Sequence, residues 1–159
     1  MSTSVNKPAQ PRPEVASSWS VKSADTWSRW FDVIEAGARP VSERMIELAG
    51  IGPGSRVLDL ATGLGEPAMT AARYVEEVGY VEAIDSCRPM IDLARDRASR
   101  IGLDNIQFRD LSAEDLDYPD GAFDAILSRW GLMFVDDLPS SLRRFRRFLR
   151  PGGALEVGS

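Results

Sequence analysis

One segment constrains the fold of this 159-residue sequence more than any other: a short apolar run that ends in a glycine-rich turn. Residues 56–60 (RVLDL) are too few for a helix, and Gly63 and Gly65 follow directly, so the run predicts a buried strand. Pro67 suits the first turn of a helix, and residues 67–77 are therefore expected to be helical. A buried strand, a glycine turn and a helix form the opening unit of an α/β protein.

Strand and helix patterns alternate along the remaining sequence. We expect strands at 80–85, 105–109 and 123–128, and a fifth that begins at 154, with helices at 89–101 and 140–150. This alternation predicts a parallel sheet with helices on both faces.

The sequence before the first strand divides into two parts. Residues 1–20 hold three prolines and little periodic apolarity, which predicts a mobile tail. A helix capped by Ser23 is expected to run to about Ala36, where Gly37 and Pro40 break it, and a second helix is expected at 41–49. We therefore predict a tail (1–20), a helical lid segment (21–50) and a ligand-binding domain (51–159).

Composition excludes several functions. The net charge of −5 gives no global preference for nucleic acid or anionic membrane, and no apolar run approaches the length of a membrane span. The sequence has no histidine and one cysteine, so we expect no metal site and no internal disulfide. One cysteine and the lack of a visible signal peptide favour a cytoplasmic location.

The glycine turn and a later acid predict a nucleoside site. In an open parallel sheet, ligands bind at the carboxyl ends of the strands, where glycines let the backbone approach them. Asp85 ends the second expected strand 20 residues after Gly65, where an acid accepts hydrogen bonds from ribose hydroxyls. The alternative is structural: glycines for a tight turn, and Asp85 as a helix cap.

The charge of the turn distinguishes between cofactors. Residues 63–68 match the G-x-G-x-x-A pattern of dinucleotide-binding proteins, so an NAD-dependent oxidoreductase is one alternative. However, Glu66 places a negative charge at the helix start, Pro67 offers no N–H, and Asp59 adds a second carboxylate. This favours a ligand that has a ribose and positive charge but no phosphate, such as S-adenosyl-L-methionine (SAM).

Four segments together resemble the class I SAM-dependent methyltransferases, and most closely the UbiE-like group, or methyltransferase type 11 domain. They are 57–68 (motif I of that family), 81–90, 108–124 and 149–153, and the resemblance covers about residues 40–159. It implies a Rossmann-like doubly wound sheet with strand order 3-2-1-4-5 and an N-terminal helical lid. It also implies methyl transfer from SAM to a small-molecule acceptor with an O, N or C nucleophile.

The resemblance further implies which residues bind SAM. Asp59, Ala61, Gly63 and Gly65 would line its methionyl end, Asp85 would hold the ribose, and Met90 would pack near the adenine. The complete predicted cofactor set is Asp59, Ala61, Thr62, Gly63, Gly65, Asp85, Ser86, Met90, Ala113, Glu114, Ser128 and Arg129. The sequence departs from the family at Ala61, where a glycine is usual, and at Ser112, where an aspartate is usual.

The family normally continues beyond the point where this sequence stops, which leads us to expect a C-terminally truncated chain. Its fifth strand would then be an exposed edge, open to a second copy or another partner. A catalytically incomplete SAM-binding module is therefore an alternative to an active enzyme.

Aromatic residues before and after the predicted core could form an acceptor pocket. The expected substrate residues are Trp27, Trp30, Phe31, Trp130 and Met133. For Trp27, Trp30 and Phe31 the helical spacing equally fits a stripe packed on the sheet. Methyl transfer is an in-line displacement that depends mainly on proximity, and no catalytic base is identified from the sequence.

Overall fold

The structure, a computed structural model, describes residues 21–158. The predicted tail, residues 1–20, lies outside the described residues. The elements in chain order are α2 (Val21–Leu48), β1 (Arg56–Leu60), α3 (Ala68–Val75), β2 (Tyr80–Asp85), α4 (Arg88–Arg100), β3 (Ile106–Asp110), β4 (Phe123–Arg129), the 3₁₀ helix η1 (Leu132–Phe134), α5 (Leu138–Phe148) and β5 (Leu149–Gly158).

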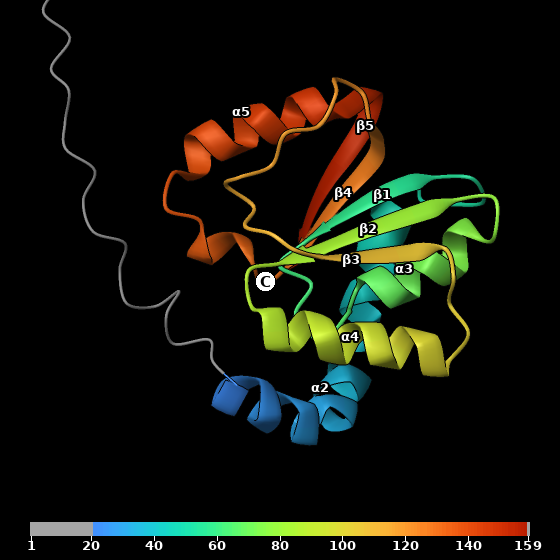
Figure 1. Cartoon of the computed structure of the whole chain (residues 1–159). Helices are drawn as coiled ribbons and strands as arrows, with labels where there is room; N and C mark the ends of the chain where they lie inside the picture. Colours follow the sequence, from blue (N-terminus) through green and yellow to red (C-terminus); the bar gives the residue numbers. More distant parts are fainter. Residues whose placement is uncertain (1–20, 159) are drawn as a thin grey trace, which may run out of the picture.

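The five strands form one sheet in the order β3-β2-β1-β4-β5, and every neighbouring pair is parallel (Figure 1). This confirms the predicted Rossmann-like topology. The order reverses between β1 and β4, and the turns after these strands lie at the same edge of the sheet. A ligand site is expected at this switch point.

Strand alternation places a separate apolar core on each face of the sheet. Val57 faces the cluster formed with α3, α4 and the C-terminal part of α2, whereas Leu58 faces the cluster that includes Phe145 and Phe148 of α5. Helices therefore cover both faces, as predicted (Figure 1).

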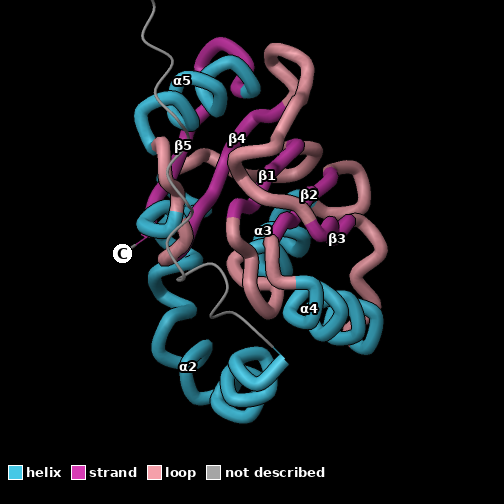
Figure 2. Tube along the Cα trace, turned by 60° about the vertical axis from the view of Figure 1, so that its left-hand side comes forward, coloured by secondary structure: helices cyan, strands magenta, loops and turns pink. Residues whose placement is uncertain are grey.

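The predicted break in the N-terminal helix is wrong, because α2 is a single helix of 28 residues with Pro40 inside it. Pro40 and Ala36, whose carbonyl loses its helical donor, are both exposed, so water can satisfy that carbonyl. The opposite side of the helix is held by burial of Ala38 and Ser42. Figure 2 shows α2 changing direction along its length and crossing the end of the sheet.

The predicted start of the last strand is also wrong. α5 ends at Phe148, and β5 begins at Leu149 rather than at residue 154. Leu149 pairs with Phe123, and a register irregularity follows before Ala154 pairs with Ala125. Residues 151–153, which the sequence pattern assigned to a turn, therefore lie within β5 at this irregularity.

Candidate active site

Asp85 connects the glycine turn to the end of β2. Its two carboxylate oxygens accept hydrogen bonds from the backbone N–H of Gly63 (2.8 Å) and of Cys87 (2.8 Å). The turn is also fixed by the N–H of Thr62, which donates to the carbonyl of Ile84 at 2.9 Å. Gly63 has a φ of 56°, a region that favours glycine. The turn and the acid that the sequence singled out thus form one unit.

Two carboxylates cap the N-terminus of α3. The N–H of Ala68 donates to Asp59 Oδ2 (3.2 Å), and the N–H and hydroxyl of Thr70 both donate to Glu66 Oε2 (3.1 and 2.7 Å). The donors and the positive dipole end that would attract a phosphate are therefore already satisfied by the chain's own carboxylates.

Burial raises the pKa of three acids at this edge of the sheet, Asp59, Glu66 and Asp85. Asp59 is fully buried, and the loss of hydration raises its pKa to about 7. Burial also raises the pKa of Glu66, with a further increase from the nearby Glu35. The pKa of Asp85 is raised by burial too, although its hydrogen bonds from Cys87 and Gly63 oppose the rise.

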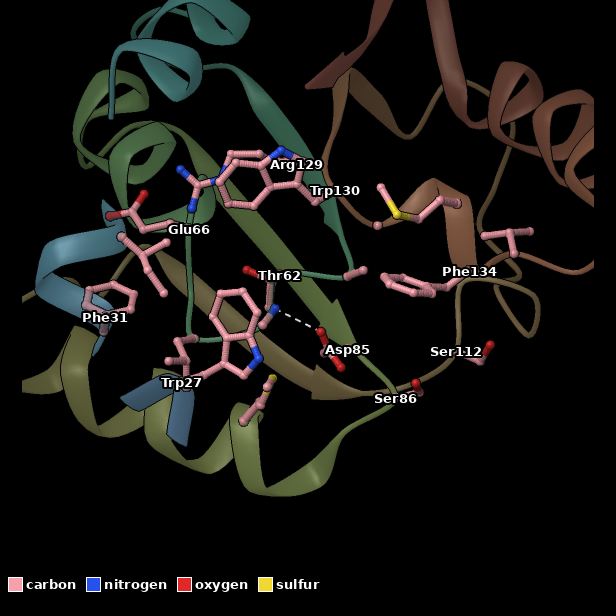
Figure 3. A pocket seen from close by; sticks show the side chains of 18 of the residues that line it. Trp27, Phe31, Thr62, Glu66, Asp85, Ser86, Ser112, Arg129, Trp130 and Phe134 are labelled. Carbon is pink, nitrogen blue, oxygen red and sulfur yellow. Dashed lines mark hydrogen bonds between the residues drawn. The ribbon is translucent and has the colours of Figure 1, made fainter. Parts of the chain in front are cut away.

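A cavity of about 650 Å³ opens above this edge of the sheet. Its lining comes from α2, the glycine turn, the end of β2 and the segment after β4 (Figure 3). The lining residues are Trp27, Phe31, Ile34, Glu35, Ala61, Thr62, Gly63, Leu64, Glu66, Asp85, Ser86, Met90, Ser112, Glu114, Arg129, Trp130, Gly131, Met133, Phe134, Val135 and Asp136.

The cavity has two chemically different ends. In Figure 3, Asp85, Ser86 and Ser112 gather on one side, and Glu66, Phe31 and Arg129 on the other, with Thr62 between them. We call the second side, formed by Glu35, Glu66, Arg129 and the Phe31 ring, the inner end. The first side offers small polar groups, and the inner end offers charge and aromatic surface.

A buried ion pair fastens α2 to the end of β4. The guanidinium of Arg129 donates to both carboxylate oxygens of Glu35 (2.7 and 3.3 Å) and to the hydroxyl of Ser42 (2.7 Å). Its Cζ atom also lies 4.8 Å from the Trp130 ring centre. The resemblance places Arg129 in the floor of a cofactor pocket; in the structure Arg129 lines the cavity, and its guanidinium bonds to residues of α2.

Close backbone approach shapes the wall after β4. A Cβ at Gly131 would lie 2.5 Å from Ala61 Cβ and 2.8 Å from Ser128 Oγ, so only glycine fits there. Trp130 has a φ of 60°, which is rare for a bulky side chain. This local geometry presents Trp130 to the cavity.

The structure gathers most of the predicted cofactor residues around one space. Eight line the main cavity, and Ala113 and Ser128 line an adjoining one of about 70 Å³. The eight are Ala61, Thr62, Gly63, Asp85, Ser86, Met90, Glu114 and Arg129. Asp59 lies buried behind the turn as a helix cap. Gly65 lies where a Cβ would meet Met69 Cε at 2.9 Å and Ala94 Cβ at 3.3 Å, so it serves close packing of α3 and α4.

The predicted aromatic set is divided. Trp27, Phe31, Trp130 and Met133 line the cavity, whereas Trp30 is 59% exposed and does not. Phe31 also packs against the core, and the Arg97 guanidinium lies 3.6 Å from its ring centre. The sequence pattern fits either a pocket residue or core packing at this position, and Phe31 both lines the cavity and packs against the core.

Sequence reasoning missed Glu35 as a cavity residue. It lies on the same helical face as Phe31 and Ala38, and a charged residue within that apolar stripe was the available signal. Val135 and Asp136 were missed because they follow η1, which the sequence pattern did not predict.

Three features define a Rossmann-like protein that binds a nucleoside-type ligand. They are the parallel sheet, the hydrogen bond between the glycine turn and Asp85, and an α3 N-terminus whose carboxylates disfavour a phosphate. A family model described as a methyltransferase domain matches residues 57–153, and the chain belongs to this family. No finding supports the oxidoreductase alternative.

Known relatives agree with this assignment. The "Ubiquinone/menaquinone biosynthesis C-methyltransferase UbiE" of Teredinibacter turnerae is 38% identical over 128 residues, which are 79% of this chain and 51% of that protein. The chain thus spans about half the length of the curated relatives it matches.

Solved structures share the fold. A SAM-dependent methyltransferase from Aquifex aeolicus has a TM-score of 0.67 and 25% identity, over 73% of this chain and 62% of that one. The [4+2]-cyclase SpnF has a TM-score of 0.69 and 30% identity, over 76% and 44%. A protein named for a different reaction therefore shares this architecture.

The family implies SAM as cofactor, and the residues present fit it. Asp85 and Glu66 both line the cavity, and these acids suit the hydroxyl and positively charged groups of SAM. Among residues 21–158, no group of three or more Cys, His, Asp or Glu side chains is arranged to hold a metal ion.

Proposed function

We propose that this chain binds SAM in the cavity between α2 and the carboxyl ends of the strands, and that it transfers the methyl group to a small-molecule acceptor. The observation that carries the proposal is the direct bond between Gly63 and Asp85, which places the glycine turn and the ribose-type acid on one wall of the cavity. The family and the UbiE relatives support methyl transfer as the reaction.

Each wall has a distinct task in this proposal. Asp85 holds the ribose, Met90 packs near the adenine, and Ser112 and Glu114 face the adenine edge. SAM supplies an electrophilic methyl group on its sulfonium. Trp27 and Trp130 exclude water and align the acceptor for in-line attack, which by proximity alone contributes roughly 7–11 kcal/mol.

The acceptor space is argued from the cavity's size and chemistry. A volume of about 650 Å³ is within the range of sites that hold drug-sized ligands. Its aromatic and apolar wall (Trp27, Phe31, Trp130, Met133 and Phe134) suits an acceptor with an apolar body.

Titration calorimetry with SAM, S-adenosylhomocysteine (SAH) and NAD is the first test. We expect SAM and SAH to bind and NAD not to bind, and NAD binding without SAM binding would refute the proposal. Because a cyclase shares the fold, binding alone is insufficient. Transfer of a labelled methyl group to a panel of phenol, amine and quinol acceptors must follow, and SAH binding without any transfer would favour the non-catalytic module.

Three finer points belong to the same proposal. The division at residue 50 into lid and core stays a prediction. A cytoplasmic location is proposed from the single cysteine. As a separate observation, no helix among residues 21–158 is long and apolar enough to span a membrane.

Assembly through β5 is the third point: within residues 21–158 this strand borders only β4 in the sheet, so its other edge is open to a second copy or a partner. Light scattering of the purified protein tests the last point.

A further inference from the structure

The inner end of the cavity carries more negative than positive charge. Arg129 is already engaged by Glu35, in a pair whose side chains are both less than 10% exposed. Glu66 lines the same space, and among residues 21–158 it forms no ion pair with an arginine. One carboxylate is therefore compensated there and one is not.

The groups packed around Glu66 come from four elements. Thr70 on α3 donates two hydrogen bonds to Oε2, Glu35 on α2 and Asp59 on β1 are acidic neighbours, and Arg129 on β4 is the basic one. Both hydrogen bonds fall on Oε2, and among residues 21–158 none is donated to Oε1. A charged Glu66 is costly there until a cation arrives.

The position of the ribose fixes which part of the ligand faces this acid. In Figure 3, Ser86 and Ser112 lie on one side of Asp85, and Thr62 and Glu66 lie on the other. A ribose held at Asp85 would therefore direct the adenine toward Ser86 and Ser112, and the sulfur-bearing chain past Thr62 toward Glu66. On this side SAM carries two positive groups, the sulfonium and the α-ammonium at the end of the chain, and only the sulfonium distinguishes it from SAH. SAH has the same chain with a neutral thioether.

We propose that Glu66 is a specificity-determining residue that makes the site discriminate the charged methyl donor from its neutral product. The inference rests on the proposed function. A carboxylate in a partly dehydrated pocket attracts the sulfonium of SAM and loses that attraction when the methyl group leaves. Glu66 thus favours exchange of product for fresh donor.

A purely structural role for Glu66 gives a different expectation. If it only caps α3, then loss of the cap weakens SAM and SAH binding equally. Thr70→Val is the matched control, because it removes the hydrogen bond from the hydroxyl and keeps both the backbone N–H bond and the Glu66 carboxylate.

The experiment measures the dissociation constants of SAM and SAH by calorimetry at mildly alkaline pH. In Glu66→Gln, we expect the Kd of SAM to rise about tenfold more than the Kd of SAH, which corresponds to about 1.4 kcal/mol. Thr70→Val, and Glu43→Gln on the exposed side of α2, should keep the wild-type ratio. Equal weakening of both ligands in Glu66→Gln, or no weakening, overturns the inference.

Two further outcomes are considered: that the Glu66→Gln variant does not fold, and that the wild-type protein binds neither ligand. If Glu66→Gln does not fold, the wild-type ratio of Kd(SAM) to Kd(SAH) is measured against pH. This ratio should fall as the pH rises and the Glu66 carboxyl, whose pKa is raised by burial, ionises; a constant ratio overturns the inference. If neither SAM nor SAH binds the wild-type protein, the proposed function itself fails.

Discussion

The backbone N–H of Gly63 lies 2.8 Å from the carboxylate of Asp85, 22 positions later in the chain. This bond ties the turn after β1 to the end of β2, so one side chain both fixes the wall of the cavity and offers an acid to the ligand. We expect Asp85→Ala to weaken SAM binding by about 1–3 kcal/mol, because the ribose loses a charge-assisted acceptor. Calorimetry measures the loss. Asp85→Asn keeps one acceptor and should lose less; a folded Asp85→Ala protein with wild-type affinity contradicts the assignment.

Asp59 makes stability depend on pH in the opposite sense to most aspartates. Its pKa is raised from 3.8 to about 7 in the folded protein, so between these values the folded state holds more protons than the unfolded one. The contribution of Asp59 to stability is therefore fully present below pH 3.8 and lost as the pH rises to about 7. We expect Asp59→Asn to gain stability relative to wild type across this window, by an amount on the order of 1–4 kcal/mol. Urea denaturation at several pH values checks this, and a pH-independent difference argues against it.

Removing one partner of the buried Arg129–Glu35 pair should destabilise the protein. Arg129→Met leaves the Glu35 carboxylate buried and unpaired, and we expect it to cost about 3–5 kcal/mol of unfolding free energy. Adding Glu35→Leu should recover much of this, because no charge then remains buried. Arg29→Met is the surface control. Arg29 lies on α2, like Glu35, and the substitution breaks an exposed ion pair with Asp25, which should change the free energy of unfolding by less than about 1 kcal/mol. Equal effects in both arginine variants would show that burial does not matter here.

Substitution of glycine by alanine should have opposite effects on stability at positions 131 and 37. Gly131→Ala forces a Cβ to within 2.5 Å of Ala61 Cβ, which should cost about 1–3 kcal/mol and narrow the cavity. At Gly37, within α2, nothing lies within 4 Å of the new Cβ, so Gly37→Ala should stabilise the protein by about 0.5–1 kcal/mol. Thermal unfolding and SAH binding are the measurements. Gly131→Ala with normal stability and affinity would mean that the wall after β4 moves freely.

The two N-terminal tryptophans should report ligand binding differently. Trp27 lines the cavity and Trp30 does not, so ligand-dependent change in tryptophan fluorescence should fall in Trp27→Phe and persist in Trp30→Phe. Titration of both variants with SAH gives the comparison. A signal that depends on Trp30 instead would contradict the position of α2 over the site.

The sequence by itself determined the sheet and the cofactor side of the site. The run at 56–60, Gly63 and Asp85 were sufficient because strand ends and tight turns follow from local patterns, and parallel strands bring their carboxyl ends to one edge. The charges of Asp59 and Glu66 already disfavoured a phosphate, and the structure adds that both cap α3.

Only the tertiary structure decided the N-terminal helix and the inner end. Gly37 and Pro40 predict a break by local propensity, yet packing of Ala38 and Ser42 keeps α2 continuous, because burial of one face outweighs a helix defect on the exposed face. Glu35 and Arg129 are 94 positions apart, and no local pattern relates them. Their pairing depends on where α2 crosses the sheet, which is a property of the assembled fold.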